Sequence, residues 1–169
     1  ASHELRTPIH AMLLSVSGVL EGYSGEISDE IREDLQIASD GITRLMHLVE
    51  SLLDLSRIEA RKFELNIEKI SLHHVFDVAI QEVAQLVEAH GHELRIDFSG
   101  DVPNIAADGE RLAQVVINLL SNAIKYTPNG GKIRIDVEKD ENDVVFSVAD
   151  NGYGIPLEAQ DPVFEKFFQ

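Results

Sequence analysis

The start of the chain combines an imidazole, a carboxylate and a hydroxyl on one predicted helix. His3 lies about 200° around the helix axis from Leu5, the first residue of an apolar stripe, so we expect its ring to face solvent. Thr7 is one turn further along the same face, and Glu4 lies beside both. A neutral imidazole that can pass a proton to a carboxylate is a nucleophile. A lone histidine at a helix end, however, more often has no chemical role, so other residues have to support this site.

A helix predicted over residues 109–126 carries a polar stripe beside its apolar face. The stripe recurs at steps of three and four residues and consists of Arg111, Gln114, Asn118, Asn122 and Lys125. The apolar face consists of Leu112, Val115, Val116, Leu119, Leu120 and Ala123. Asparagine is unfavourable inside helices, because its amide competes for backbone groups. Its side-chain oxygen suits Mg²⁺, and a lysine suits a phosphate. The alternative, a solvated face with two tolerated asparagines, is equally consistent with this stripe alone.

A third group follows a predicted strand and contains an acidic residue and two glycines, Asp150, Gly152 and Gly154. An Asn-Gly pair, here Asn151 with Gly152, often forms a two-residue hairpin turn. No alternating strand follows, however, and Pro156 would interrupt one. Glycines permit close backbone approach to a ligand, and the carboxylate can accept a hydrogen bond from a ligand amino group. We therefore interpret these residues as a ligand-binding loop.

The composition limits the function classes. The 30 acidic and 14 basic side chains give a formal net charge of -16, which disfavours binding to DNA or RNA. The absence of cysteine excludes disulfides, thiolate catalysis and cysteine-bound metals. No apolar run is long enough to cross a bilayer. The other histidines do not form a carboxylate-backed metal site, and we expect ordinary surface or boundary positions for His10, His47, His73, His74, His90 and His92.

Two long helices are predicted in the first part of the chain. Apolar residues recur at steps of four and three over residues 3–22, and again from Ser28, the predicted N-cap, to near Lys62. A loop with Gly22 and Gly25 separates them, which predicts an antiparallel hairpin. Two helices of this size cannot bury so wide an apolar stripe, so we expect a homodimer in which two hairpins form a four-helix bundle. The alternative is that the hairpin packs on the rest of its own chain.

The remainder of the chain predicts an α/β sandwich, in which a mixed sheet is covered by helices on one face. Strand-like patterns occur around Leu65 and Ile67 and over residues 94–98, 133–137 and 144–148, the last two forming a hairpin. Amphipathic helices are predicted over residues 75–89 and 109–126. Residues 100–104 read as a loop, and residues 127–131 end the second of these helices abruptly.

Together the three groups resemble motifs of the sensor histidine kinases of two-component signalling. Residues 2–8 (SHELRTP) are similar to the H box, residues 118–128 (NLLSNAIKYTP) to the N box, residues 150–154 (DNGYG) to the first glycine box and residues 163–168 (VFEKFF) to the F box. Residues 53–60 (LDLSRIEA) are typical of the second helix of such hairpins. The four motifs follow the family's order over nearly the whole chain, and this combination is far more specific than any one motif.

The resemblance implies a role for each residue. His3 would be the phosphoacceptor, Glu4 its general base, and Thr7 would help to position a hydrolytic water when the partner is dephosphorylated. The nucleotide contacts would be Asn118 and Lys125 near the phosphates, Tyr126 against the nucleotide, Asn122 on Mg²⁺, Asp150 on the adenine amino group, and Gly152 and Gly154 giving room. The cofactors would be ATP and Mg²⁺. The partner would be the receiver domain of a response regulator, whose aspartate takes the phosphoryl group.

The resemblance also divides the chain. Residues 1–64 would be the dimerisation and histidine phosphotransfer domain, and residues 65–169 an ATP-binding domain that stops before the second glycine box and most of its lid. The expected enzyme is an ATP:protein-histidine phosphotransferase, and we expect activity of the parent protein rather than of this truncated piece. Phosphatase activity toward the partner stays open. The localisation implied is cytoplasmic, with membrane contact only through regions outside this chain.

Two other functions stay open on the sequence alone. A degenerate kinase could serve as a nucleotide-gated dimer scaffold, and an ATPase of the same sandwich superfamily could hydrolyse ATP without a phosphohistidine. The pair formed by His3 and Glu4 argues against the ATPase, which needs no exposed histidine with a carboxylate beside it. Nucleotide affinity and phosphohistidine formation, measured separately, discriminate between the three.

Overall fold

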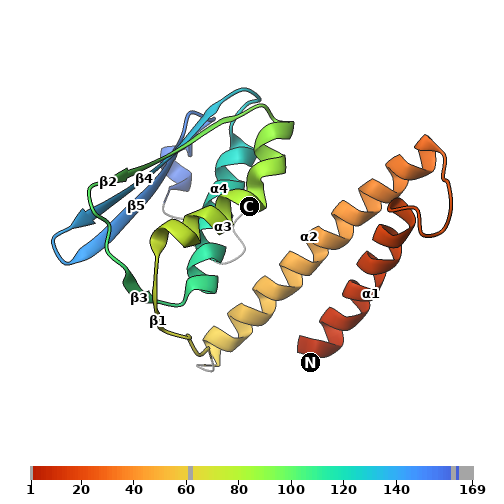
Figure 1. Ribbon diagram of the computed structural model, residues 1–169, viewed down its shortest axis with the longest axis horizontal. Coiled ribbons are helices and arrows are strands. Elements are labelled where there is room, and N and C mark those ends of the chain that lie inside the picture. Colours follow the sequence, from red (N-terminus) through yellow and green to blue (C-terminus); the bar gives the residue numbers. More distant parts are fainter. Residues whose placement is uncertain (1, 61–62, 161–162, 164–169) are drawn as a thin grey trace. The chain divides into compact units, whose positions relative to one another are not determined.

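The computed structural model describes residues 2–60, 63–160 and 163, without the side chains of Ser2, His3 and His47. The chain divides into two compact units, the helical unit (residues 1–64) and the α/β unit (residues 65–169). The elements follow in the order α1 (Ser2–Leu20), α2 (Asp29–Glu59), β1 (Glu68–Ile70), α3 (Leu72–Ala89), β2 (Glu93–Ser99), β3 (Ile105–Ala107), α4 (Gly109–Tyr126), β4 (Lys132–Asp140), β5 (Asp143–Asp150) and the 3-10 helix η1 (Leu157–Ala159) (Figure 1). No helix in the described part of the chain is long and apolar enough to cross a membrane.

The helical unit is an antiparallel hairpin of α1 and α2, as the apolar periodicity predicts (Figure 1). α1 ends at Leu20, and the loop that follows contains Gly22 and Gly25, both at positive φ. α2 begins after Ser28, whose Oγ accepts a hydrogen bond from the N–H of Ile31 at 3.3 Å. The predicted N-cap is therefore confirmed. α2 ends slightly before the predicted end near residue 62.

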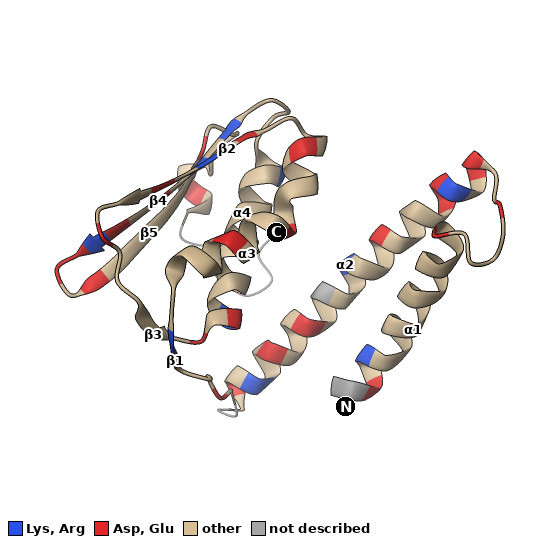
Figure 2. Ribbon diagram, in the orientation of Figure 1, with Lys and Arg blue, Asp and Glu red and all other residues tan. Residues whose placement is uncertain are grey.

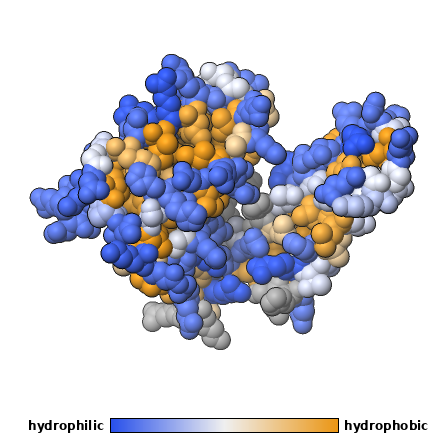
Figure 3. All heavy atoms as spheres, viewed as in Figure 1, coloured by the Kyte–Doolittle hydropathy of each residue, from blue (hydrophilic) through white to orange (hydrophobic). Residues whose placement is uncertain are grey.

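The hairpin does not bury its own apolar stripe. Leu5, Ile31 and Leu52 occupy predicted core positions, yet 50%, 50% and 54% of their surfaces are exposed. Ile9 is the one residue that is fully buried among the side chains described in this unit. Figure 3 shows apolar side chains open to solvent along the helices. The stripe therefore lacks a covering surface within the hairpin.

The main sheet of the α/β unit is mixed and has the strand order β2-β4-β5. β2 pairs with β4 in parallel, and β4 pairs with β5 antiparallel, so the last two strands form the predicted hairpin. The register sets Ile135 between Ile96 on β2 and Val148 on β5, so the apolar residues of all three strands share one face. α3 and α4 pack on this face, which confirms the predicted mixed sheet with helices on one side.

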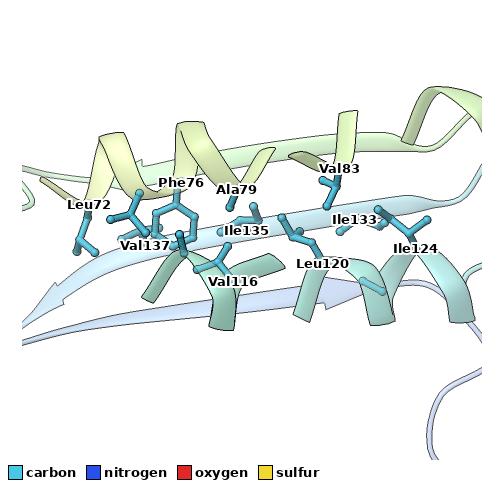
Figure 4. Packing of buried hydrophobic residues seen from close by; sticks show 13 residues of the cluster. Leu72, Phe76, Ala79, Val83, Val116, Leu120, Ile124, Ile133, Ile135 and Val137 are labelled. Atoms are coloured by element: carbon cyan, nitrogen blue, oxygen red, sulfur yellow. The ribbon is translucent and has the colours of Figure 1, made fainter. Parts of the chain in front are cut away.

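The core of the α/β unit lies between these two helices and the sheet. Phe76 on α3, Leu120 on α4 and Ile135 on β4 are fully buried. Figure 4 shows these side chains between the two helices and the sheet. Phe76 also contacts the rings of Phe98 and Phe146 edge-on, at centroid distances of 5.8 and 5.4 Å. This packing fixes α4, which carries the predicted polar stripe, against the sheet.

Two short strands and one helix start differ from the prediction. β1 forms at Glu68–Ile70 rather than around Leu65 and Ile67, which are 53% and 56% exposed. The sequence predicts no strand where β3 forms. α3 begins at Leu72 rather than near residue 75. Among the described residues, β1 and β3 pair with each other alone, antiparallel, although they are far apart in the sequence. Strands of three residues are too short to show an alternating pattern, so the sequence carried no usable signal for them.

The other face of the main sheet is polar and carries ion pairs. Glu93 contacts Arg95 and Lys132, and Arg134 contacts Asp136 (charged residues are coloured in Figure 2). The hydrogen bond and charge of Arg95, followed by the charge of Lys132, hold the pKa of Glu93 below its ordinary value. Exposed pairs of this kind contribute little to stability, and the face is ordinary solvated surface.

Candidate functional site

Asp108 fixes the start of α4 and Thr127 its end, and these two ends set the position of the polar stripe. Asp108 caps the start: its Oδ1 accepts from the N–H of Arg111 at 3.1 Å, and its Oδ2 accepts from the N–H of Asn66 at 3.0 Å. These hydrogen bonds, that of Arg111 first, hold the pKa of Asp108 below its ordinary value of 3.8. Thr127, buried and extended, ends the helix ahead of Pro128.

The side chains of the stripe lie on the open side of α4. Asn118, Asn122 and Lys125 are exposed. Arg111 and Gln114 are half-buried and hydrogen-bonded to each other at 2.9 Å. Two amide groups and an ammonium group thus follow one another along the C-terminal half of the helix, where a ligand can reach them.

The buried face of α4 is shifted around the helix relative to the predicted apolar face. Val116, Leu120 and Ala123 are buried, but Val115 and Leu119 are 48% and 41% exposed. Val115 precedes Asn118 by three positions and Leu119 precedes Asn122 by three, so each exposed residue lies beside an asparagine on the helix surface. The structure instead buries Ala113 and Ile124, which the predicted face left out, so the buried face is turned away from Val115 and Leu119. In the structure they form an apolar strip beside the two amides.

The C-terminal end of α4 is joined to the loop of residues 150–154, which we call the Asp150 loop. The carbonyl oxygen of Tyr126 accepts a hydrogen bond from the N–H of Tyr153 at 3.1 Å. Lys125 Nζ lies 4.8 Å from the centroid of the Tyr126 ring, within range of a cation–π contact. Both side chains are exposed. The fold therefore brings the end of the N-box-like helix and the glycine-box-like loop together.

The Asp150 loop is held by hydrogen bonds of its own residues. Asp150 ends β5, and its Oδ1 accepts from the N–H of Gly152 at 2.8 Å. Asn151 exchanges two bonds with the backbone of Lys132: its N–H donates to the carbonyl at 3.2 Å, and its Oδ1 accepts from the N–H at 2.7 Å. No strand follows in the described residues after Asp150, as predicted. The Asp150 carboxylate is left exposed at the end of the strand.

The two glycines of this loop meet different structural needs. A Cβ on Gly152 would lie 2.8 Å from Asp150 Oδ1 and 2.9 Å from the carbonyl carbon of Tyr126, closer than real Cβ atoms come. Gly154 has open space around it, but its φ of +70° favours glycine. Gly152 is therefore required by the packing of the loop on the helix end, a reason that the sequence alone does not reveal.

The H-box-like residues belong to the helical unit, at the start of α1. Glu4 and Thr7 are exposed on this helix. The side chain of His3 is outside the described residues, so its exposure stays a prediction. The F-box-like residues 163–168 also lie largely outside the described part of the chain.

The remaining histidines lie where expected, with one exception. His10, His73 and His74 are exposed and His90 is half-buried, while the side chain of His47 is outside the described residues. His92, predicted at the surface or boundary, is instead only 8% exposed. The turn before β2 places its ring against the last turn of α4, where Nε2 lies 3.3 Å from the carbonyl oxygen of Ile124. Within the described residues, no group of three or more His, Asp or Glu side chains is arranged to hold a metal ion.

Two family models match the two parts of the chain. Residues 1–61 match the His Kinase A (phospho-acceptor) domain. Residues 107–169 match the domain described as histidine kinase-, DNA gyrase B-, and HSP90-like ATPase. A phospho-acceptor hairpin followed by an ATPase sandwich defines the class of the histidine kinases.

Similar proteins extend this match over the whole chain. The circadian input-output histidine kinase CikA of Synechococcus elongatus is 34% identical over 170 residues, which are 99% of this chain and 22% of CikA. The sensor histidine kinase WalK of Bacillus subtilis is 31% identical, over 99% of this chain and 28% of WalK. The crystal structure of full-length ShkA in complex with AMPPNP has a TM-score of 0.77 and 27% identity, over 99% of this chain and 36% of that one. The chain belongs to the sensor histidine kinases, and it spans less than a third of the length of these two curated relatives.

Proposed function

We propose that this chain is the core of an ATP-dependent histidine autokinase, which phosphorylates His3 and passes the phosphoryl group to an aspartate of a response regulator. The observation that supports the proposal most directly is the junction between α4 and the Asp150 loop, where Tyr126 accepts from Tyr153. It joins two exposed amides and a cation on a helix to an exposed carboxylate on a loop. These are the groups that a magnesium-nucleotide needs.

The nucleotide would bind along α4 and the Asp150 loop. The exposed carboxylate of Asp150 would accept a hydrogen bond from the adenine amino group. Lys125 and Asn118 would lie near the phosphates, and the exposed ring of Tyr126 would contact the nucleotide. Gly152 and Gly154 would keep the loop backbone close to the ligand. The relative ShkA forms a complex with AMPPNP, which supports the binding of a nucleotide by this chain.

Asn122 would be the protein's ligand to Mg²⁺. Its side-chain oxygen is a hard, neutral donor on the exposed side of α4. A single amide ligand fits an ion that keeps several waters and takes other ligands from phosphate oxygens. When bound, Mg²⁺ would offset negative charge on the phosphates, which matters in a protein with a formal net charge of -16.

The phosphoryl transfer would use His3 and Glu4. One ring nitrogen of His3 forms a bond to the γ-phosphorus as the bond from that phosphorus to the departing ADP oxygen breaks. Glu4 takes the proton from the other ring nitrogen, so no positive charge accumulates on the ring. An aspartate of the receiver domain then accepts the phosphoryl group from His3. Thr7 would help to position the water that removes this group from the regulator.

The helical unit would form a dimer with a second copy of itself. The half-exposed stripe that includes Leu5, Ile31 and Leu52 lacks a covering surface within one hairpin. Full burial of an aliphatic side chain contributes about 1.5–3 kcal/mol, so pairing of two such stripes supplies a large driving force. The same surface on both copies gives the self-complementary interface of a symmetric four-helix bundle.

The test is phosphohistidine formation in the full-length protein. With ATP labelled at the γ-phosphate and Mg²⁺, we expect acid-labile label on the wild type and none on His3→Gln. His10→Gln is the matched control, because His10 is an exposed histidine further along α1, and it should keep the label. Label that persists in His3→Gln would refute the assignment of His3. Nucleotide binding without label would favour a scaffold, and turnover without label would favour a plain ATPase.

A further inference from the structure

The C-terminal end of α4 is closed by hydrogen bonds from distant segments. Thr127 follows the helix with an extended backbone (φ −103°, ψ 130°), so the chain does not form the left-handed turn that often caps the last carbonyls. Tyr126 instead accepts from the N–H of Tyr153 at 3.1 Å. The carbonyl oxygen of Ile124 lies 3.3 Å from Nε2 of His92. Two of the free carbonyls at this helix end thus have partners from outside the helix.

His92 lies in the turn between α3 and β2, which is also bound to the segment after α4. The carbonyl of His90 accepts from the N–H of Gly130 at 2.9 Å. The N–H of Glu93 donates to the carbonyl of Gly131 at 2.9 Å. Backbone bonds on both sides of His92 therefore fix the place from which its ring reaches α4. His92 as a whole is 8% exposed, and its ring contacts the last turn of the helix.

One ring nitrogen of His92 has a partner and the other does not. A carbonyl oxygen can only accept, so the bond to Ile124 requires a proton on Nε2, and in the neutral ring Nδ1 then carries the lone pair. Nδ1 is buried and has no hydrogen-bond partner among the described residues. A buried polar atom without a partner lowers stability, whereas an apolar side chain of similar size would avoid that cost. The distinctive contribution of histidine at this position is its N–H donor to α4.

We propose that His92 is a positioning residue for the nucleotide site, an inference that rests on the proposed function. Its N–H holds the carbonyl of Ile124, and Lys125 and Tyr126 follow directly in the chain. The carbonyl of Tyr126 in turn holds the Asp150 loop through Tyr153. A shift of the last turn of α4 therefore moves the lysine, the tyrosine ring and the adenine-binding loop together.

The test compares two substitutions in the full-length protein. His92→Gln keeps an amide N–H close to the position of Nε2, whereas His92→Phe fills the space without a donor. For Mg-AMPPNP, we expect His92→Phe to raise the Kd roughly three- to tenfold, the effect of about one hydrogen bond, and His92→Gln to stay within about twofold. Without nucleotide, hydrogen exchange at the N–H of Tyr153 should be faster in His92→Phe and close to wild type in His92→Gln.

Val137→Ala is the control for a general loss of stability. Val137 is fully buried, and Figure 4 shows it at the opposite end of the core from Ile124. This variant should lower the unfolding midpoint and leave both the Kd and the exchange of Tyr153 unchanged. If His92→Phe does not fold, His92→Asn, whose amide is too short to reach Ile124, takes its place against His92→Gln.

The outcomes separate this inference from the proposed function. Wild-type Kd and exchange in the variant without the donor would overturn the inference, and so would equal changes in Val137→Ala. Failure of the wild-type protein to bind Mg-AMPPNP would overturn the proposed function. In that case the exchange rate at Tyr153 still decides whether His92 holds the helix end.

Discussion

Replacing Gly152 by alanine is expected to weaken nucleotide binding by displacing the Asp150 loop. The added methyl group would lie 2.8 Å from Asp150 Oδ1 and 2.9 Å from the carbonyl carbon of Tyr126, and closer still to the Tyr126 oxygen. Real Cβ atoms essentially never come within 3.0 Å of such neighbours. The Tyr126 atoms are backbone atoms of α4, whose residue Leu120 is fully buried in the core. The loop, rather than the helix, therefore has to move.

The magnitude follows from what this movement disturbs. Overpacking of this kind costs about 1–3 kcal/mol. The loop relieves it by moving on the order of 0.5–1 Å, a misplacement large enough to disturb a binding geometry. The movement stretches the hydrogen bond of 3.1 Å between Tyr153 and Tyr126, which contributes about 1 kcal/mol. If the overpacking cost of about 1–3 kcal/mol falls on the bound state, the Kd rises roughly five- to 150-fold.

The assay is a titration of the full-length protein with Mg-AMPPNP, together with thermal unfolding. Gly109→Ala is the matched control: its Cβ would lie 3.5 Å from Ile70, an ordinary contact, and a helix favours alanine over glycine. The control should keep the wild-type Kd and an equal or higher unfolding midpoint. Binding by Gly152→Ala as tight as wild type would refute the reasoning, because the loop would then not depend on its contact with α4.

Two further predictions concern the dimer and the start of α4. Leu52→Glu should raise the dimer dissociation constant at least about a hundredfold in analytical ultracentrifugation, because each copy loses an apolar contact. The control Leu14→Glu should leave the dimer dissociation constant unchanged, because Leu14 is 67% exposed and lies off the stripe. A Leu52→Glu variant that still dimerises as tightly as wild type would contradict the four-helix bundle. Hydrogen bonds from Arg111 and Asn66 lower the pKa of Asp108 in the folded protein. Its contribution to folding stability is therefore complete above pH 3.8, its ordinary pKa, and is lost as the pH falls through the lowered pKa. Asp108→Asn keeps the cap but should flatten this acid limb in urea unfolding, and an unchanged slope would count against the assignment.

The elements with local signals could be predicted from the sequence. α4 runs from Gly109 to Tyr126 as expected, because Asp108 caps it, apolar residues repeat with the helical period, and Pro128 follows. The cap at Ser28 and the hairpin of β4 and β5 follow from similarly short patterns. The order of four short motifs was enough to identify the family, since each motif is a run of neighbouring residues.

Features that depend on pairing between distant segments were missed or misplaced. β1 and β3 are three-residue strands that, among the described residues, pair with each other alone, and strands this short show no period. Val115 and Leu119 look like core residues by hydropathy, but α4 has a single face toward the sheet, and the two residues lie beside it. Neither outcome can be read from a window of sequence, because each depends on which surface packs where.

The sequence by itself determined the residue types that can do chemistry here and the helices and strands that carry them. Only the tertiary structure placed the end of α4 against the Asp150 loop, buried His92 beneath Ile124, and left Gly152 no room for a side chain. The physical reason is the same in all three cases. A core packed from α3, α4 and the sheet decides which distant backbone groups meet, and those contacts set the geometry of the site.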